Sequence, residues 1–377
     1  MPTPPLDPAL AKEAWEAWQR HGGPDVLGAR LAAANELGLT ANTLGDRAKK
    51  HRRIDPAIQA SMNEIGTEMV PQLAWLKTKN ENGTSYSVLL KPAQPEEADL
   101  IDRIRDAFGG MDAAKPVAAP AYNDADLLAV YPLADVHIGM MAWGRETGED
   151  YDTRIAANRV REWVGRCIAA SPAAETAVIL DVGDLTHADD QMNQTPKSKH
   201  VLDVDTRHFR TLDITIATMT AAVDLALAKH KHVLVRILTG NHNPTSFMAV
   251  IFAVAAWYRD EPRVTVHKDP SEFFAMEWGN VMLAAHHGDK SKAERMVLFL
   301  ADQYPEMWGR TRHRFLFTGH LHHHKSADIG GVQWEQLRAV TARDAYAVSH
   351  AYAARAQMQG ITYHKERGEI QRVKVGL

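Results

Sequence analysis

The sequence predicts an α/β domain preceded by a small helical domain. After about residue 125, short apolar runs alternate with polar loops and helical stretches, the pattern of an α/β sandwich. Before residue 60, apolar residues recur at helical spacing. At roughly 150 residues per domain, a chain of 377 residues holds two or three domains. We expect a helical domain at 1–60, a small α+β or linker region at 61–124 and the α/β domain at 125–377.

Residues 9–53 predict three short helices. The first ends at the Gly-Gly-Pro sequence of residues 22–24, the second covers 25–34, and the third covers about 41–51. Trp15 and Trp18 lie three residues apart and share one helical face, so we expect both in the core of this domain.

The second and third helices resemble the helix-turn-helix of DNA-binding proteins. Gly38 in the turn suits a left-handed backbone, Thr40 can cap the next helix, and Leu44 takes the place of the buried residue. The third helix ends in a basic run, which we interpret as a phosphate-contacting segment; the alternative is a solvated helix end. The DNA-binding candidates are Arg47, Lys49, Lys50, Arg52 and Arg53.

The middle region predicts a hairpin, a helix and a linker. Two strands at 69–76 and 85–90 flank a turn that contains Asn-Gly, and residues 96–108 form an amphipathic pattern. Residues 113–121 are rich in alanine and proline, as linkers often are.

Composition limits the partners. The net charge of -4 gives no global positive field, so nucleic acid would have to bind a local patch. No apolar run is long enough to span a bilayer, and the N-terminus lacks the features of a secretory signal. We therefore expect a cytoplasmic protein with no membrane partner. The single cysteine, Cys167, lies in a helical apolar stretch and is expected in the core.

Four apolar runs in the α/β region predict buried strands, at 127–134, 176–182, 232–239 and 281–285. Each is followed by Asp, Asn or His. Because sites in open α/β sheets lie beyond the carboxyl ends of the strands, we expect these side chains to share one site.

Histidine is unusually frequent there: 15 of the 19 histidines fall between residues 137 and 324. In Asp-x-His and His-x-His patterns, a strand would place both side chains on one face, and an adjacent glycine would allow a tight turn. Imidazole, carboxylate and one amide oxygen suit manganese, iron or zinc. The clusters are Asp135-Val136-His137, Gly183-Asp184-Leu185-Thr186-His187, Gly240-Asn241-His242, His286-His287-Gly288-Asp289 and Gly319-His320-Leu321-His322.

These five clusters, in this order, resemble the motifs of the calcineurin-like metallophosphoesterase superfamily over residues 127–336. The resemblance implies a four-layered α/β/β/α sandwich with two divalent metal ions, for which we expect manganese, with iron, zinc or nickel as alternatives. It assigns Asp135, His137 and His322 to the first metal, Asn241, His287 and His320 to the second, Asp184 as the bridge and His242 as the catalytic histidine.

Some assignments have alternatives. The superfamily usually has an acidic residue where this chain has Asn243, so a charge that would support His242 is missing. His287 is preferred over His286 because it precedes glycine. His187, together with Asp189 and Asp190, could face substrate. His323 and His324 are expected in a solvated loop, and the remaining candidates are expected at the surface or in structural roles: His200, His208, His230, His232 and His267.

The expected function is phosphodiester hydrolysis of nucleic acid, as a DNA nuclease, by attack of a metal-bridging hydroxide. The motifs also resemble the nuclease branch that processes DNA ends, and the arrangement resembles phosphoesterases of phages and prophages. One alternative is a nucleotide or small phosphoester hydrolase whose N-terminus only assembles subunits. Another is a DNA-binding adaptor with a structural metal domain.

Overall fold

The computed structural model describes residues 8–22, 28–51, 75–79, 85–89 and 113–376. The chain divides into two compact units, Met1–Glu96 and Glu97–Leu377, which are described separately. The helix expected at 96–108 and the cations Arg52 and Arg53 lie outside the described residues.

Among the described residues of the first unit, three helices lie close to the predicted ones, although the second begins at Ala29, after Gly28 in a left-handed conformation, rather than at residue 25. They are α1 (Pro8–Arg20), α2 (Ala29–Glu36) and α3 (Ala41–His51). Leu44 is fully buried, and Trp15 and Trp18 pack against the same small core with ring centroids 6.4 Å apart. The apolar spacing therefore predicted the core of this unit.

The turn between α2 and α3 has the predicted chemistry. Gly38 adopts φ +65°, a left-handed conformation that costs little without a Cβ atom. The Thr40 Oγ1 atom accepts a hydrogen bond from the backbone N–H of Thr43 at 3.1 Å, which caps α3. Farther along, β1 (Trp75–Lys79) and β2 (Ser85–Leu89) pair antiparallel, as expected for the hairpin.

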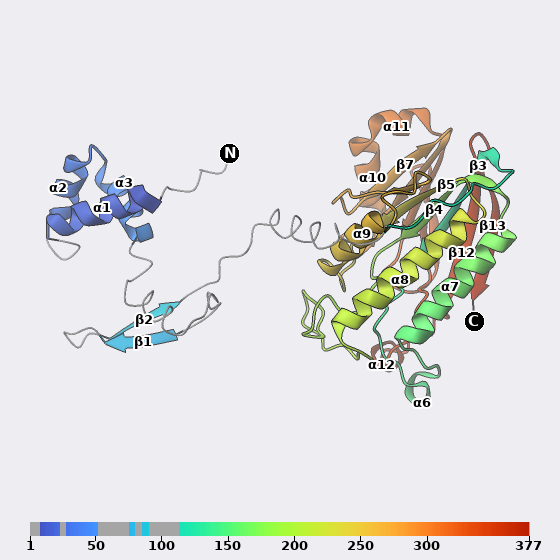
Figure 1. Cartoon of the computed structure of the whole chain (residues 1–377), viewed down its shortest axis with the longest axis horizontal. Helices are drawn as coiled ribbons and strands as arrows, with labels where there is room; N and C mark the ends of the chain where they lie inside the picture. The colour runs from blue at the N-terminus through green and yellow to red at the C-terminus, as the bar shows by residue number, and fades with distance from the viewer. Residues whose placement is uncertain (1–7, 23–27, 52–74, 80–84, 90–112, 377) are drawn as a thin grey trace. The chain divides into compact units, whose positions relative to one another are not determined.

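The second unit contains two sheets, shown in Figure 1. In the six-stranded sheet, β3, β4, β5 and β6 are parallel, while β12 and β13 are antiparallel additions. Its order is β13 (Gly368–Gly376), β12 (Gln357–His364), β3 (Asp124–Leu133), β4 (Ala174–Asp181), β5 (His232–Ile237) and β6 (Val264–Val266).

In the five-stranded sheet, β8, β9 and β11 are parallel, and an antiparallel strand lies at each edge. Its order is β10 (Lys325–Ile329), β11 (Val332–Gln336), β9 (His313–Thr318), β8 (Val281–Ala285) and β7 (Phe274–Trp278).

Alternate residues of β3 belong to different cores, because successive side chains of a strand point to opposite faces. Ala129, Tyr131 and Leu133 pack toward the helices. Leu128 and Val130 pack between the two sheets. This burial on both faces explains why the strand reads as a continuous apolar run rather than an alternating one.

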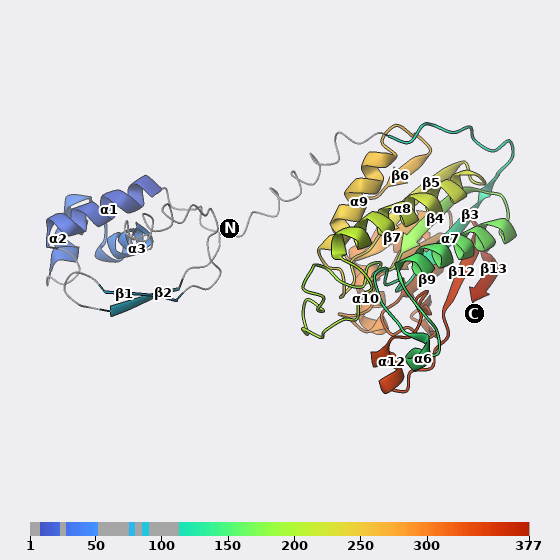
Figure 2. The ribbon, with the colours of Figure 1, turned by 60° about the horizontal axis from the view of Figure 1, so that its bottom comes forward.

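Helices cover the outer face of each sheet. Figure 2 shows α7 (Thr153–Ala170), α8 (His208–Leu227) and α9 (Ser246–Trp257) side by side over the six-stranded sheet. On the other side, α10 (Ala293–Gln303) and α11 (Pro305–Arg310) cover the five-stranded sheet through a third apolar core. The predicted four-layered α/β/β/α sandwich is thus confirmed. The described part of this unit also contains two short helices, α6 (Gly144–Thr147) and α12 (Ala345–Ser349).

The alanine- and proline-rich segment at 113–121 lies on this unit. The Ala114 N–H donates to the carbonyl of Trp257 at 2.7 Å, and the Val117 N–H donates to Glu261 at 2.8 Å. Arg263, which is almost buried, donates to the carbonyls of Val117 and Ala118. Where it is described, the predicted linker is therefore anchored by hydrogen bonds.

Cys167 is fully buried in the helix-side core, as predicted. None of the helices in the described ranges has the length and hydrophobicity that a bilayer-spanning segment needs.

Candidate dinuclear metal site

The predicted ligands converge where the carboxyl ends of the two sheets meet. Loops after β3, β4 and β5 supply Asp135, His137, Asp184 and Asn241 from one sheet, and loops after β8 and β9 supply the remaining histidines from the other. The expectation of one shared sheet edge was therefore wrong in one respect: β8 lies in the second sheet, so the site spans both.

The first donor group consists of Asp135, His137 and His322, whose ligand atoms all lie within 4.8 Å of one another. The Nε2 atoms of His137 and His322 are 3.3 Å apart, and His322 Nε2 lies 3.4 Å from Asp135 Oδ1. Asp135 and His137 are buried. These are the three residues assigned to the first metal from the sequence.

The second donor group consists of Asp184, His287 and His320, again within 4.8 Å. The Asn241 Oδ1 atom lies 3.0 Å from His287 Nε2, so the amide joins the same group. The Nδ1–H of His287 donates to the Val182 carbonyl at 3.0 Å, which leaves Nε2 facing the group. Such a second hydrogen bond is the usual way to orient a metal-binding imidazole.

Asp184 connects the two groups. Its Oδ2 atom lies 3.0 Å from His287 Nε2 and 4.0 Å from His137 Nε2. Burial alone would raise the pKa of Asp184, but the charges of His287 and His242 outweigh it and hold the pKa well below its usual value. In the same way, burial would lower the pKa of His287, but the Asp184 carboxylate raises it to about 10. This point of the molecule therefore stabilises a positive charge.

The ligand-bearing segments are not extended strands, contrary to the alternation expected from the sequence. Asp135, His137, Asp184, His320 and His322 all have φ between +49° and +71°. For residues other than glycine, this left-handed conformation costs on the order of 1 kcal/mol or more, and it is concentrated at functional sites.

Backbone hydrogen bonds hold these loops in place. The N–H of Asp135 donates to the Gly183 carbonyl at 3.2 Å, and the N–H of His137 donates to the Asp184 carbonyl at 3.0 Å. The His320 N–H lies 3.0 Å from both carboxylate oxygens of Asp135. The pairing of β3 with β4 thus continues past the strand ends, and it brings the first donor group to the second.

At two positions a glycine is needed because any larger side chain would collide with a carboxylate, not because of a turn. A Cβ atom on Gly240 would lie 2.0 Å from Asp184 Oδ1, and one on Gly319 would lie 2.6 Å from Asp135 Oδ2. Gly183 and Gly288 adopt positive φ and fit the turn-forming role expected from the sequence, and a Cβ atom on Gly183 would in addition lie 2.5 Å from His287 Nδ1.

His187 and His242 form a third group with His137. His187 Nδ1 lies 3.1 Å from His137 Nδ1, on the ring edge opposite His322. The Nδ1–H of His242 donates to the His187 carbonyl at 2.8 Å, which leaves Nε2 for chemistry. His187 is only 2% exposed; its ring also stacks on that of His242, with centroids 5.2 Å apart, and it lines the cavity described below.

Asn243 does not hold His242 in the way that an acidic residue at this position was expected to. Its side chain is fully buried, and Oδ1 accepts the Gly240 N–H at 3.0 Å. Asp189, expected near substrate, instead accepts the N–H groups of Thr245 and Ser246 at the start of α9. Both side chains shape the loop that carries Asn241 and His242.

The neighbouring histidines have other partners. His286 Nδ1 accepts the Gly288 N–H, and its ring packs on Phe273, so His287 is the one that enters the donor group. His323 pairs with the Leu321 carbonyl and His324 with Glu335. His230, fully buried between Tyr131 and the Ala174 carbonyl, has a structural role, as expected.

The donor set fits two divalent cations. Burial and the neighbouring imidazole of His242 hold the pKa of His137 well below its usual value, so the ring is neutral, the form that binds metals. Nitrogen and oxygen donors of this kind suit manganese, iron, zinc or nickel, and they do not select among them.

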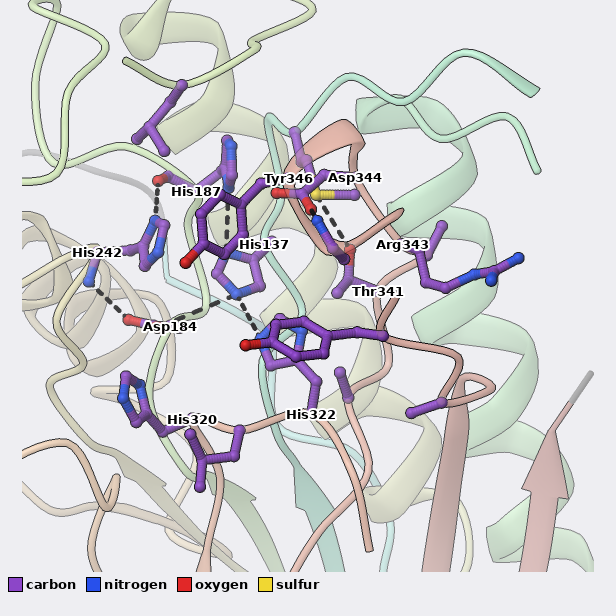
Figure 3. A pocket seen from close by; sticks show the side chains of 18 of the residues that line it. His137, Asp184, His187, His242, His320, His322, Thr341, Arg343, Asp344 and Tyr346 are labelled. Atoms are coloured by element: carbon purple, nitrogen blue, oxygen red, sulfur yellow. Dashed lines mark hydrogen bonds and ion pairs between the residues drawn. The ribbon is translucent and has the colours of Figure 1, made fainter. Parts of the chain in front are cut away.

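A cavity of about 650 Å³ opens beside the donor groups. Figure 3 shows His137, Asp184, His242, His320 and His322 at one end of it. The segment from 339 to 356 lines much of the remainder, including two tyrosines. The role of this segment was not predicted, since it carries no metal-ligand motif. Its alternation of alanine with tyrosine and arginine was the available signal. His200, expected at the surface or in a structural role, also lines the cavity.

No protein-family model and no curated protein matches the chain. Several solved structures resemble it remotely. A dimetal phosphatase from Danio rerio is 11% identical, with 67% of this chain and 99% of that chain covered and a TM-score of 0.38. An archaeal phosphodiesterase is 10% identical, covering 66% and 99%, with a TM-score of 0.34. A predicted phosphoesterase from Streptococcus pneumoniae is 10% identical, covering 67% and 100%, with a TM-score of 0.29.

Proposed function

We propose that this chain is a metal-dependent phosphodiesterase of the calcineurin-like metallophosphoesterase superfamily that acts on nucleic acid. The observation that carries this is the pair of donor groups that share Asp184. One carboxylate lies within 4.0 Å of an imidazole nitrogen from each group, at the meeting point of two sheets. A purely structural polar cluster would not need six further donors on both sides of that carboxylate.

Asp135, His137 and His322 would hold one cation, Asn241, His287 and His320 the other, and Asp184 both. Two divalent cations held there would neutralise phosphate oxygens and activate water for attack on phosphorus. The chain's own contribution is to orient the imidazoles through hydrogen bonds such as that of His287 to the Val182 carbonyl, and to keep His137 neutral through burial.

His242 is the group we propose as the proton donor to the leaving oxygen. Its Nδ1–H is committed to the His187 carbonyl, and the ring lines the cavity beside the donor groups. A proton on Nε2 would therefore face a phosphate bound at that end. General acid catalysis by such a histidine contributes roughly 10²- to 10⁴-fold to rate.

The nucleic-acid assignment is supported by the N-terminal unit. Its α2–turn–α3 arrangement has the Gly38 conformation and Thr40 cap expected of a helix-turn-helix. The first part of the basic run, with Arg47, Lys49 and Lys50, belongs to α3. We propose DNA as the partner of this unit and cleavage of DNA as the activity.

The experiment is hydrolysis of bis(p-nitrophenyl) phosphate with added manganese by the wild type, His242→Ala and His232→Ala. His232 is exposed at the start of β5, far from its carboxyl end, and serves as the control. We expect His242→Ala to lose at least about 10²-fold in kcat and to keep both metals, while His232→Ala is unchanged. Absence of hydrolysis by the wild type would favour a DNA-binding adaptor. Cleavage of mononucleotides but not of plasmid DNA would favour the small-phosphoester hydrolase.

A further inference from the structure

The cavity beside the donor groups extends far beyond what a phosphate group needs. Its volume of about 650 Å³ is in the middle of the range for ligand pockets. Along the segment from 339 to 356, the lining side chains are mostly alanines, with two tyrosines and two arginines between them. Because the alanine side chains are small, they leave the tyrosine rings uncovered.

These rings form a row. The Tyr346 and His350 ring centroids are 4.1 Å apart, and those of His350 and Tyr352 are 5.8 Å apart and nearly parallel. The ring of His200, which also lines the cavity, has its centroid 6.3 Å from that of Tyr346. His350 is itself fixed, because its Nδ1–H donates to the Tyr346 carbonyl at 2.9 Å. Both tyrosine rings therefore lie next to an imidazole that is fixed in position.

Both tyrosines are nonetheless open to solvent, since Tyr346 and Tyr352 are each 56% exposed. In Figure 3, the Tyr346 ring points into the cavity, toward the end that holds His137 and His242. An exposed aromatic ring is common on protein surfaces. Two such rings on one supported row, at the mouth of a candidate phosphate-binding site, are not explained by packing.

The charges along this wall suit an anionic chain. Arg355 is exposed and lines the cavity. Arg343 also lines it, but its guanidinium donates to the Thr147 carbonyl at 3.1 Å and points away from the histidines in Figure 3. The nearby Asp344 carboxylate is already engaged, because it accepts the Ala347 N–H at 2.7 Å as the cap of α12. Asp203 is the other carboxylate of the lining outside the donor groups. Aromatic rings beside cations are the pattern that binds unpaired nucleic-acid strands.

We propose that this row stacks the bases of an unpaired nucleic-acid strand, with Tyr346 and Tyr352 as the stacking residues, while the adjoining phosphodiester lies at the donor groups. The inference rests on the proposed function for the position of the phosphate. Stacking requires access to the face of a base, which a paired base offers only when it leaves the duplex stack. The row therefore makes unpaired nucleotides the preferred substrate.

The test uses the full chain and two labelled oligonucleotides of equal length, one with bases and one built from abasic units. Binding is measured by fluorescence anisotropy in chelator, and hydrolysis is measured with manganese. The variants are Tyr346→Ala, Tyr352→Ala and Tyr346→Phe. The control is Tyr122→Ala, because Tyr122 is 74% exposed and precedes β3, at the opposite end of the strand from the site.

We expect the wild type to bind the base-bearing strand more tightly than the abasic strand. Each tyrosine-to-alanine change should reduce that preference by about fivefold to a hundredfold and leave abasic binding unchanged. Tyr346→Phe keeps the ring and should keep the preference, and Tyr122→Ala should match the wild type. Every variant contains the N-terminal unit. Its contribution to binding therefore cancels when the affinity for the base-bearing strand is divided by the affinity for the abasic strand.

Equal wild-type affinity for the two strands would overturn the inference. So would a loss in Tyr346→Ala that is the same for both strands, since that would indicate a general structural effect. If the wild type hydrolyses neither strand but the base preference is present and lost in Tyr346→Ala, the stacking inference stands and the proposed hydrolytic function fails.

Discussion

The Oδ2 atom of Asp184 lies 3.0 Å from the Nε2 atom of His287, and this contact joins the end of a strand in one sheet to the end of a strand in the other. Each residue alters the other: the pKa of the carboxyl group falls and that of the imidazole rises to about 10 despite burial. A divalent cation would take the place of the proton in stabilising this pair.

Gly240 should be as important for metal binding as a residue that binds the metal directly. Gly240→Ala would place a methyl group 2.0 Å from Asp184 Oδ1 and 2.4 Å from the Asp184 backbone nitrogen, so the carboxylate must move. We expect loss of bound metal, measured by elemental analysis. Gly309→Ala is the matched control, because nothing lies within 4 Å of its added Cβ atom. Normal metal content in Gly240→Ala would show that the bridging carboxylate tolerates displacement.

His187 should act as a positioning residue for His137. If His137 binds through Nε2, its Nδ1–H donates to His187 Nδ1, 3.1 Å away. We expect His187→Ala to weaken one of the two metals by roughly 10- to 100-fold in a chelator competition assay. His187→Asn offers an acceptor oxygen at a similar position and should restore part of the affinity. Unchanged affinity in both variants would indicate that the imidazole contact has no role in metal binding.

The burial of His230 predicts that the folded protein loses stability as the pH falls. Its burial lowers its pKa to about 4, whereas the unfolded chain has an ordinary histidine. Below about pH 6.5 the unfolded state binds a proton that the folded state does not, so the stability from this group is lost as pH falls toward 4. Between pH 7 and pH 5 the contribution is about 2 kcal/mol.

Urea unfolding in chelator at the two pH values checks this. The drop in the free energy of unfolding should be smaller in His230→Gln than in the wild type, while the exposed His232→Gln should match the wild type. Equal drops in all three proteins would mean that His230 is protonated in the folded state.

If the lysines of α3 contact DNA phosphates, the affinity for DNA should depend on salt concentration. Changing Lys49 and Lys50 to Gln should reduce the slope of log affinity against log salt by up to about two for duplex DNA, since each phosphate contact adds about 0.9. Changing the exposed Lys268 and Lys374 is the control. An unchanged slope in the first variant would exclude these lysines as phosphate contacts and favour the assembly role.

Much of the fold could be predicted because the central strands are buried on both faces. Runs such as 176–182 contain little but apolar residues, so β4 was clear from the sequence. The exposed edge strand β10 and the terminal β13 carry polar residues and were not recognised, and neither were the largely buried strands β9 and β12. Their place is fixed by pairing with distant strands, which no local pattern records.

The donor groups could be anticipated from residue types and order, but their geometry could not. The left-handed backbone of Asp135 and His137 depends on hydrogen bonds to the loop after β4, about 50 residues away. The place of His187 behind His137, and the aromatic row at Tyr346, likewise depend on segments that meet only in the folded chain.

The most direct test of the dinuclear site compares metal content and manganese-dependent diester hydrolysis in the wild type, Asp184→Asn and Asp181→Asn. Both aspartates are buried at the end of β4, but Asp181 belongs to neither donor group, and burial raises its pKa, so an amide is a suitable replacement there. The account predicts about two metals per chain in the wild type and in Asp181→Asn. Asp184→Asn should lose bound metal and activity together while remaining folded. Two tightly bound metals and full activity in Asp184→Asn would contradict it.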